Sequence, residues 1–515
     1  MTKSFAPSRS AGPGGPHGCV AAGHPVTAEA AAAVLRAGGN AFDAALAGLY
    51  AACVAEPVLA SLGGGGFLLA RPASGAPRMF DFFVHTPQRR RPASEAHAYP
   101  IVTDWGTAQQ EFQIGLGTAA VPGIVRGIFA VHRALGRVPM ADIVAPAAAA
   151  ARDGVAVTPF QAYLMTLVAP IYLGTPETRA LFTGAEGDVI RSPEAAAVLE
   201  ALGRDGDDLF YAGDVAATIA DTCRSGGGHI TRDDLRRYAV VVRDPLTVRY
   251  RDAAVTTNPP PSAGGTLIAF GLGLLQRADL RDLAFGSPAH AAVLARVMAR
   301  TVDARTAHGS GAHLLADDLL ARYAAELADV RAAYRGTTHI SVVDRAGNAA
   351  AVTVSNGEGC GALVPGTGMM LNNMLGEDDV NPAGVHAWPE GQRLSSMMAP
   401  TMLTRDDGWF AVTGSGGSKR IRTAILQVVS NLIDFAMTPE EAVAAPRLHV
   451  EEGHLSVEAG LGPATEAMLA GLLPRHTLWN ARNMFFGGVH TVARAPDGAL
   501  AGVGDPRRGG VCLVV

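Results

Sequence analysis

The sequence predicts a fold that mixes α-helices and β-strands, and the distribution of periodic patterns carries that prediction. In the middle of the chain the apolar residues mostly recur at helical spacing. From Thr337 to the C-terminus strand patterns dominate, with one strong helix expected at 422–435 and another at 439–445. Periodicity by itself therefore indicates the α+β class and gives no layer order.

The first elements are predicted from capping signals. Residues 1–17 are rich in Ser, Gly and Pro and are expected to form a disordered tail. A short strand is predicted at 19–22, and Thr27 is expected to cap the helix that follows. Asn40, with Asp43 three residues later, predicts the capping box of a second helix.

Four consecutive glycines, Gly63 to Gly66, allow two interpretations. A phosphate cradle needs a Lys-Ser or Lys-Thr pair after the glycines, and none follows. We favour the alternative, a sharp turn that leads into a strand at 67–70. Gly271 and Gly273 also lack the third glycine of a dinucleotide motif. Neither stretch therefore predicts a nucleotide site.

The segment that begins at Thr337 is predicted to form a β-hairpin. Ile340, Val342 and Val343 lead to a turn at Gly347-Asn348, and 349–355 forms the returning strand. Thr337 then lies at the start of a core strand. If the peptide bond before it is cut, Thr337 gains an α-amino group with an ordinary pKa of about 8. Such an amine can act as general base for the hydroxyl of the same residue.

Several strings of the sequence together resemble the γ-glutamyltranspeptidase family, nearly from end to end. They are 39–45, 61–67, 337–344, 365–368 with 371–373, 394–397 and 413–418. The resemblance implies a four-layer αββα sandwich of the N-terminal-nucleophile hydrolase type. It also implies one precursor that cuts itself between Gly336 and Thr337, giving a large subunit, 18–336, and a small subunit, 337–515, in one intertwined unit.

The resemblance also implies the catalytic groups. Thr337 is the expected nucleophile, and Ser355 is expected to hydrogen-bond to it; otherwise Ser355 is a polar residue on the solvent face of a strand. The backbone N–H groups of Gly416 and Gly417 are expected to form the oxyanion hole, since amides without side chains can approach a developing oxyanion closely. A plain tight turn is the alternative for these two glycines.

Five residues are expected to contact the substrate. By resemblance, Ser395 and Ser396 bind its carboxylate, Glu377 binds its α-amino group, and Asn356 is a further candidate. Phe83 stands where the family has an arginine that pairs with the substrate α-carboxylate. Phenylalanine cannot form that bidentate ion pair.

Two features near these residues bear on the substrate site. The run Arg89 to Arg91 either supplies a replacement cation or forms a solvated surface. Only 374–394 separates the paired asparagines from Ser395, which leaves no room for a long lid loop. The substrate site is therefore expected to be open.

The implied activity is that of a self-processing threonine hydrolase or acyltransferase. It would form an acyl-enzyme on Thr337 and pass the acyl group to water or an amine, with a γ-glutamyl amide as the simplest substrate. The alternative is a non-glutamyl substrate, including hydrolysis of a carbon–carbon bond in an alkylproline-type biosynthetic intermediate. A third possibility is a catalytically silent relative that binds a peptide or metabolite.

Composition narrows the range of possible partners, cofactors and cellular locations. A net charge of −5 gives no reason to expect nucleic acid as a partner. Five dispersed cysteines and an N-terminus without an apolar signal segment favour a cytoplasmic protein, and the apolar run 44–55 is too short to span a membrane. No pattern predicts a metal or cofactor. The expected partners are a small-molecule substrate and the other subunit, with a homodimer of processed heterodimers as a possible assembly.

Overall fold

The computed structural model describes residues 15–515 except 105–108, 183, 279, 281–282 and 326–336. Most of the predicted tail and Gly336, on one side of the predicted cleavage point, therefore lie outside the described residues. Thr337, on the other side, is described.

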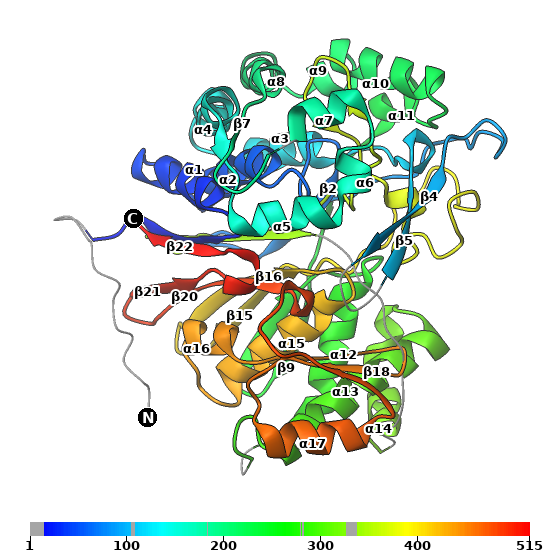
Figure 1. Ribbon diagram of the computed structural model, residues 1–515. Helices are drawn as coiled ribbons and strands as arrows, with labels where there is room; N and C mark the ends of the chain where they lie inside the picture. The colour runs from blue at the N-terminus through cyan, green and yellow to red at the C-terminus, as the bar shows by residue number, and fades with distance from the viewer. Residues whose placement is uncertain (1–14, 105–108, 183, 279, 281–282, 326–336) are drawn as a thin grey trace.

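Two antiparallel sheets lie face to face at the centre of the molecule (Figure 1). The first has the strand order β22 (Val511–Val514), β1 (Gly18–Ala22), β11 (Thr338–Asp344), β12 (Ala349–Ser355), β2 (Gly65–Arg71), β3 (Arg78–Phe82) and β8 (Val241–Arg243). The second has the order β21 (Leu500–Val503), β20 (Gly488–Arg494), β16 (Phe410–Gly416), β15 (Thr401–Arg405), β10 (Ala253–Thr257) and β9 (Leu246–Tyr250).

Helices cover the outer face of each sheet (Figure 1). The layer on the first sheet includes α1 (Pro25–Arg36), α2 (Ala41–Ala55), α3 (Ile124–Leu135), α4 (Met140–Asp153) and α8 (Pro193–Asp205). The layer on the second includes α12 (Ala263–Arg277), α13 (Pro288–His308), α15 (Arg420–Ile433), α16 (Pro439–Ala444) and α17 (Pro463–Leu472). The αββα prediction is confirmed. No helix in the described ranges is both long and apolar enough to cross a membrane.

The remaining elements are shorter and lie around these layers. The helices are α5 (Pro159–Leu167), α6 (Ala169–Tyr172), α7 (Pro176–Phe182), α9 (Asp208–Tyr211), α10 (Asp214–Ser225), α11 (Arg232–Arg237) and α14 (Asp317–Ala325). The strands are β4 (Tyr99–Asp104), β5 (Gln109–Ile114), β6 (Val155–Ala156), β7 (Val189–Ile190), β13 (Leu363–Val364), β14 (Met369–Met370), β17 (Leu448–Glu451), β18 (His454–Val457) and β19 (Arg475–Leu478).

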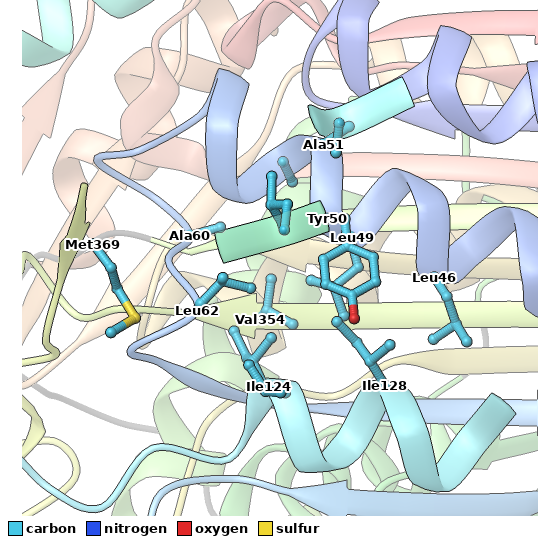
Figure 2. Close-up of a cluster of buried hydrophobic side chains, with 14 of the residues drawn as sticks. Leu46, Leu49, Tyr50, Ala51, Ala60, Leu62, Ile124, Ile128, Val354 and Met369 are labelled. Carbon is cyan, nitrogen blue, oxygen red and sulfur yellow. The ribbon is translucent and has the colours of Figure 1, made fainter. Parts of the chain in front are cut away.

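The predicted hairpin is confirmed as β11 and β12, and it lies in the middle of the first sheet. Every residue of both strands is buried, because one face meets the outer helices and the other meets the second sheet. Val352 and Val354 pack towards α2 and α3, whereas Ala349 and Ala351 contribute to the core between the sheets. Figure 2 shows Val354 among the side chains of the outer core.

The helix starts were predicted with mixed success. The capping box of Asn40 and Asp43 is confirmed at the start of α2. Thr27 is not the cap of α1: the cap is His24, whose Nδ1 accepts a hydrogen bond from the Val26 N–H. The Thr27 hydroxyl instead donates to Glu56 at 2.7 Å, a partner at the other end of α2 that the local sequence does not reveal.

Candidate active site

Thr337 lies in a pocket between the two sheets. The residue directly precedes β11 and is 3% exposed. The pocket comprises about 330 Å³ of space, part of it open to solvent, and is lined by Phe83, Thr337, Ser355, Met374, Glu377, Asp379, Val380, Ser396, Met397, Met398, Ser418 and Ile421. Five of the nine residues predicted to be catalytic or to contact the substrate are in this lining: Thr337, Ser355, Phe83, Glu377 and Ser396.

Ser355 is placed beside Thr337 by the pairing of the hairpin strands. Thr338 pairs with Val354, so the same register sets Thr337 opposite Ser355. Ser355 is 4% exposed and lines the pocket, which excludes the solvent-face interpretation. Its Oγ accepts a hydrogen bond from the Gly357 N–H at 3.0 Å, which orients the hydroxyl group at the end of β12.

Gly416 and Gly417 form the turn between β16 and α15, as predicted. A Cβ atom on Gly416 would lie 1.9 Å from the carbonyl oxygen of Thr337, so no side chain fits there. Gly417 has a φ of 122°, a conformation that strongly favours glycine. Ser418, which lines the pocket, is also left-handed with a φ of 52°. The turn thus brings Gly416, which has no side chain, against the Thr337 backbone, whereas Gly417 packs against Gly487 and Arg508; neither glycine is part of the pocket lining.

Glycines of the run 63–66 pack against the chain segments that carry Ser355 and Phe83. A Cβ atom on Gly64 would lie 2.3 Å from the Ser355 carbonyl oxygen, and one on Gly65 would lie 2.6 Å from the Val84 nitrogen. Glycine is therefore needed for β2 to pass between the end of β12 and the segment that carries Phe83. This close packing, with β2 beginning at Gly65, confirms the turn interpretation.

The opposite wall of the pocket is largely apolar. Phe83 is fully buried, and its ring stacks on Phe67 with the centroids 5.5 Å apart. Its carbonyl oxygen accepts hydrogen bonds from the Tyr238 hydroxyl at 2.7 Å and from Arg393. Arg393 also donates to Tyr238 and to the Ala239 carbonyl oxygen, so its guanidinium group is held behind Phe83 and outside the pocket lining.

The polar groups of this wall are carboxylates and hydroxyls. Glu377 and Asp379 both line the pocket. Asp379 accepts a hydrogen bond from the Ser418 hydroxyl, and its Oδ1 lies 3.5 Å from Lys419 Nζ. The Ser396 Oγ accepts a hydrogen bond from the Met398 N–H at 3.0 Å. Among the described residues, neither arginine nor lysine lines this pocket.

Two predicted substrate contacts lie outside the lining. The Ser395 hydroxyl donates to the Pro261 carbonyl oxygen at 2.9 Å. Asn356 is completely buried next to Ser355 but does not reach the pocket surface. Arg90 and Arg91 donate to the carbonyl oxygens of His386 and Arg224, at or near the molecular surface. The arginine run therefore does not replace the family arginine in this structure.

Sequence reasoning missed Asp379, Ser418 and the three methionines of the lining, Met374, Met397 and Met398. Ser418 and Met397 lie inside strings that carry the family resemblance, and Asp379 lies two residues after Glu377. Their proximity to those strings was the only sequence signal for these residues. Proximity does not show which side chains point into the pocket. Within the described residues, no group of three or more His, Cys, Asp or Glu is arranged to hold a metal ion.

The histidine nearest to Thr337 in the sequence is structural. His339 is completely buried, and its ring nitrogens lie 2.8 Å from the Thr353 hydroxyl and 3.0 Å from the Ser341 hydroxyl. Burial holds the pKa of His339 well below its usual value, and the nearby His490 lowers it further. A neutral imidazole that is hydrogen-bonded on both sides serves the packing between the sheets.

Comparisons with known proteins show which family the sequence resembles. Residues 27–515 match the family model described as gamma-glutamyltranspeptidase. The chain is 31% identical to the glutathione hydrolase proenzyme of Escherichia coli (strain K12), over 92% of this chain and 87% of the relative. It is 30% identical to the acylase ACY 1 proenzyme of Pseudomonas sp. (strain V22), over 97% and 94%.

A solved structure extends the agreement to the fold. The crystal structure of cephalosporin acylase from Bacillus halodurans matches with a TM-score of 0.84 at 24% identity, covering 100% of this chain and 98% of that one. The protein is thus an enzyme, a self-processing hydrolase or transferase with an N-terminal nucleophile. The chain belongs to the γ-glutamyltranspeptidase family.

Proposed function

We propose that the chain cuts itself between Gly336 and Thr337 and that Thr337 then transfers an acyl group to water or an amine. The observation that supports this most is the position of Thr337, buried in a pocket beside Ser355 and against the Gly416 turn. In both sheets, strands from before the cleavage point pair with strands from after it, as β1 pairs with β11 and β10 with β15. The two pieces would therefore stay together after the cut.

Self-cleavage uses the hydroxyl of Thr337 as nucleophile. Its oxygen attacks the carbonyl carbon of Gly336, the bond to the Thr337 nitrogen breaks, and that nitrogen takes a proton. Water then hydrolyses the resulting ester, which frees the carboxylate of Gly336 and the α-amine of Thr337. In the mature enzyme this amine is the general base.

The mature enzyme repeats the chemistry on a substrate. The α-amine of Thr337 accepts the hydroxyl proton while the oxygen attacks the substrate carbonyl. The N–H groups of Gly416 and Gly417 stabilise the oxyanion, and the leaving amine takes the proton from the α-ammonium. Water or an acceptor amine then releases the acyl group by the reverse sequence.

The substrate that we propose lacks a free α-carboxylate beside the scissile acyl group. Phe83 fills the wall where the family has an arginine, and three methionines continue the apolar surface. A desolvated carboxylate there would have no guanidinium partner, at a cost of several kcal/mol. The acylase relative, rather than the glutathione hydrolase, is then the better guide to the substrate.

The test is a comparison of two chromogenic anilides, one with a γ-glutamyl group and one with an unsubstituted acyl chain of similar length. We expect the simple acyl anilide to be hydrolysed with the higher kcat/KM, and we expect Thr337→Ala to abolish both reactions. A clear preference for the γ-glutamyl anilide would overturn the substrate proposal. Hydrolysis of a carbon–carbon bond would use the same nucleophile and stays a prediction of the sequence.

Two further proposals concern the cellular setting. A cytoplasmic location is supported by five cysteines that are all free, including Cys19 and Cys512, whose thiols share a hydrogen bond at 3.4 Å rather than a disulfide. Fractionation of cells that express the chain tests the location. A homodimer of processed heterodimers is the assembly that we propose, and light scattering of the cleaved protein tests it.

A further inference from the structure

A buried arginine that does not line the pocket contacts the backbone of the nucleophile residue. Arg508 is 3% exposed, and its Nη1 donates to the carbonyl oxygen of Thr337 at 3.0 Å. The same guanidinium group lies under the glycine turn: Cβ atoms on Gly416 and Gly417 would come within 2.9 Å of Nη1 and 3.3 Å of Nη2. One fixed positive charge therefore touches both parts of the catalytic site.

The position of Arg508 is set by a rigid support. Arg508 ends a short 3-10 turn whose cap is Asp505, and its N–H donates to the Asp505 carbonyl oxygen at 3.1 Å. The Asp505 side chain accepts from the Val489 N–H at 2.8 Å, and Arg507 donates to Glu458 at 2.8 Å. Burial would raise the pKa of Asp505, but Arg447 and Arg507 bring it down to about 2. Asp505 is thus ionised, and its ion pairs with Arg447 at 2.7 Å and with Arg507 at 3.3 Å hold the turn in place.

The charge of Arg508 is only partly balanced near Thr337. Glu56 is a buried carboxylate that interacts electrostatically with Arg508, and it accepts hydrogen bonds from the hydroxyls of Thr27 and Thr338 at 2.7 Å. Burial raises the pKa of Glu56, whereas these two hydrogen bonds and Arg508 lower it. The other charged or titratable groups around the site are Glu377, Asp379, Lys419, Arg420, His339 and His490. Burial lowers the pKa of both histidines, so they are neutral.

We propose that Arg508 is a positioning residue that fixes the Thr337 backbone and keeps the mature α-amine of Thr337 in its neutral, base-competent form. Within one residue the backbone nitrogen and carbonyl oxygen are less than about 4 Å apart. The guanidinium group therefore lies close to the amine. A nearby positive charge disfavours the protonated amine and lowers its pKa. More of the amine is then a free base at neutral pH.

The proposal rests on self-cleavage before Thr337, and its test needs no substrate. The pKa of the Thr337 α-amine is measured in the processed protein by trace acetylation at a series of pH values, with mass spectrometry of the N-terminal peptide. The same protein in denaturant gives the ordinary value. We expect the native pKa to be lower by about one unit or more. An intact chain would refute the proposed self-cleavage instead, because the amine would be absent.

Variants separate the charge of Arg508 from its packing. Arg508→Met should return the amine pKa towards the denatured value, whereas Arg508→Lys should keep most of the depression. Arg251→Met is the control, because Arg251 lies in the turn between β10 and the edge strand β9 and pairs with Asp434 at 2.9 Å. That variant should leave the pKa unchanged.

A variant of Glu56 tests the proposal even if Arg508→Met does not fold. Glu56→Gln keeps a hydrogen-bonding group for Thr338 and removes the opposing charge, so the amine pKa should fall further. A native pKa equal to the denatured value would overturn the proposal, even if no variant folds. Equal pKa values in wild type and in a processed Arg508→Met protein would do the same.

Discussion

The two walls of the pocket are built in different ways. The catalytic wall consists of strand ends and a turn: Thr337 before β11, Ser355 at the end of β12, and Ser418 in the turn that follows Gly416 at the end of β16. The substrate wall consists mainly of loop residues, such as Glu377 and Met397. Backbone pairing dictates the first wall, whereas side chains in loops make the second. The chemistry should therefore tolerate fewer changes than the choice of substrate.

The largest effect is expected at the nucleophile. Thr337→Ala removes the attacking oxygen, so self-cleavage should stop and acyl transfer should fall by roughly 10⁴-fold or more. The neighbouring Thr338→Ala is the matched control, because its hydroxyl donates to Glu56 rather than into the pocket. Gel electrophoresis and anilide hydrolysis measure both variants. Cleavage by Thr337→Ala at the normal site would contradict the assignment.

The next largest effect is expected at the glycine turn. Gly416→Ala places a methyl group where only 1.9 Å separates it from the Thr337 carbonyl oxygen, so the turn must move away. Activity should fall by roughly 100-fold or more, as for the loss of an oxyanion donor. Gly471→Ala, in α17 with open space around its Cβ, serves as the control and should be neutral. Wild-type kinetics in Gly416→Ala would show that the turn is not catalytic.

A smaller loss is expected for Ser355. Ser355→Ala removes one hydroxyl beside Thr337, and hydrogen bonds to a charged or developing charged group contribute about 2 kcal/mol. The corresponding loss in kcat is about 30-fold. Ser355→Thr keeps the hydroxyl and should restore most of the activity. If the alanine and threonine variants lose the same activity, packing rather than hydrogen bonding explains the role of Ser355.

The smallest effect is expected on the substrate wall, and it should change preference more than rate. Phe83→Arg brings a guanidinium group to the apolar wall, so kcat/KM for a γ-glutamyl anilide should rise about tenfold relative to the simple acyl anilide. Phe83→Leu, which stays apolar, should leave the ratio of the two substrates unchanged. An unchanged ratio in a folded Phe83→Arg protein would show that this wall does not select the head group.

Local patterns in the sequence were sufficient where one element determines the structure. The hairpin of β11 and β12 and the capping box of Asn40 follow from residues a few positions apart. Thr27 was wrongly expected to cap α1, because its hydroxyl is used by Glu56, 29 residues away. A distant partner of this kind leaves no trace in local spacing.

In the candidate site, too, some residues were predictable from the sequence and others were not. Thr337, Ser355 and the Gly416 turn were found through motifs, because the fold fixes their backbone positions. Arg508 was not found, since it reaches Thr337 across 171 positions of sequence and through a turn held by buried ion pairs. The motif predicted that Ser395 contacts the substrate, but its hydroxyl donates to the Pro261 carbonyl oxygen instead. A motif does not determine which way a side chain in a loop points.

The most direct test of the account is the mass of the purified protein. We expect the 53.0 kDa chain to be replaced by two fragments, with Thr337 at the N-terminus of the smaller one. After brief incubation with an acyl anilide and acid quenching, that fragment should carry one acyl group. A chain that stays intact, or a new N-terminus at any residue other than Thr337, would contradict the account.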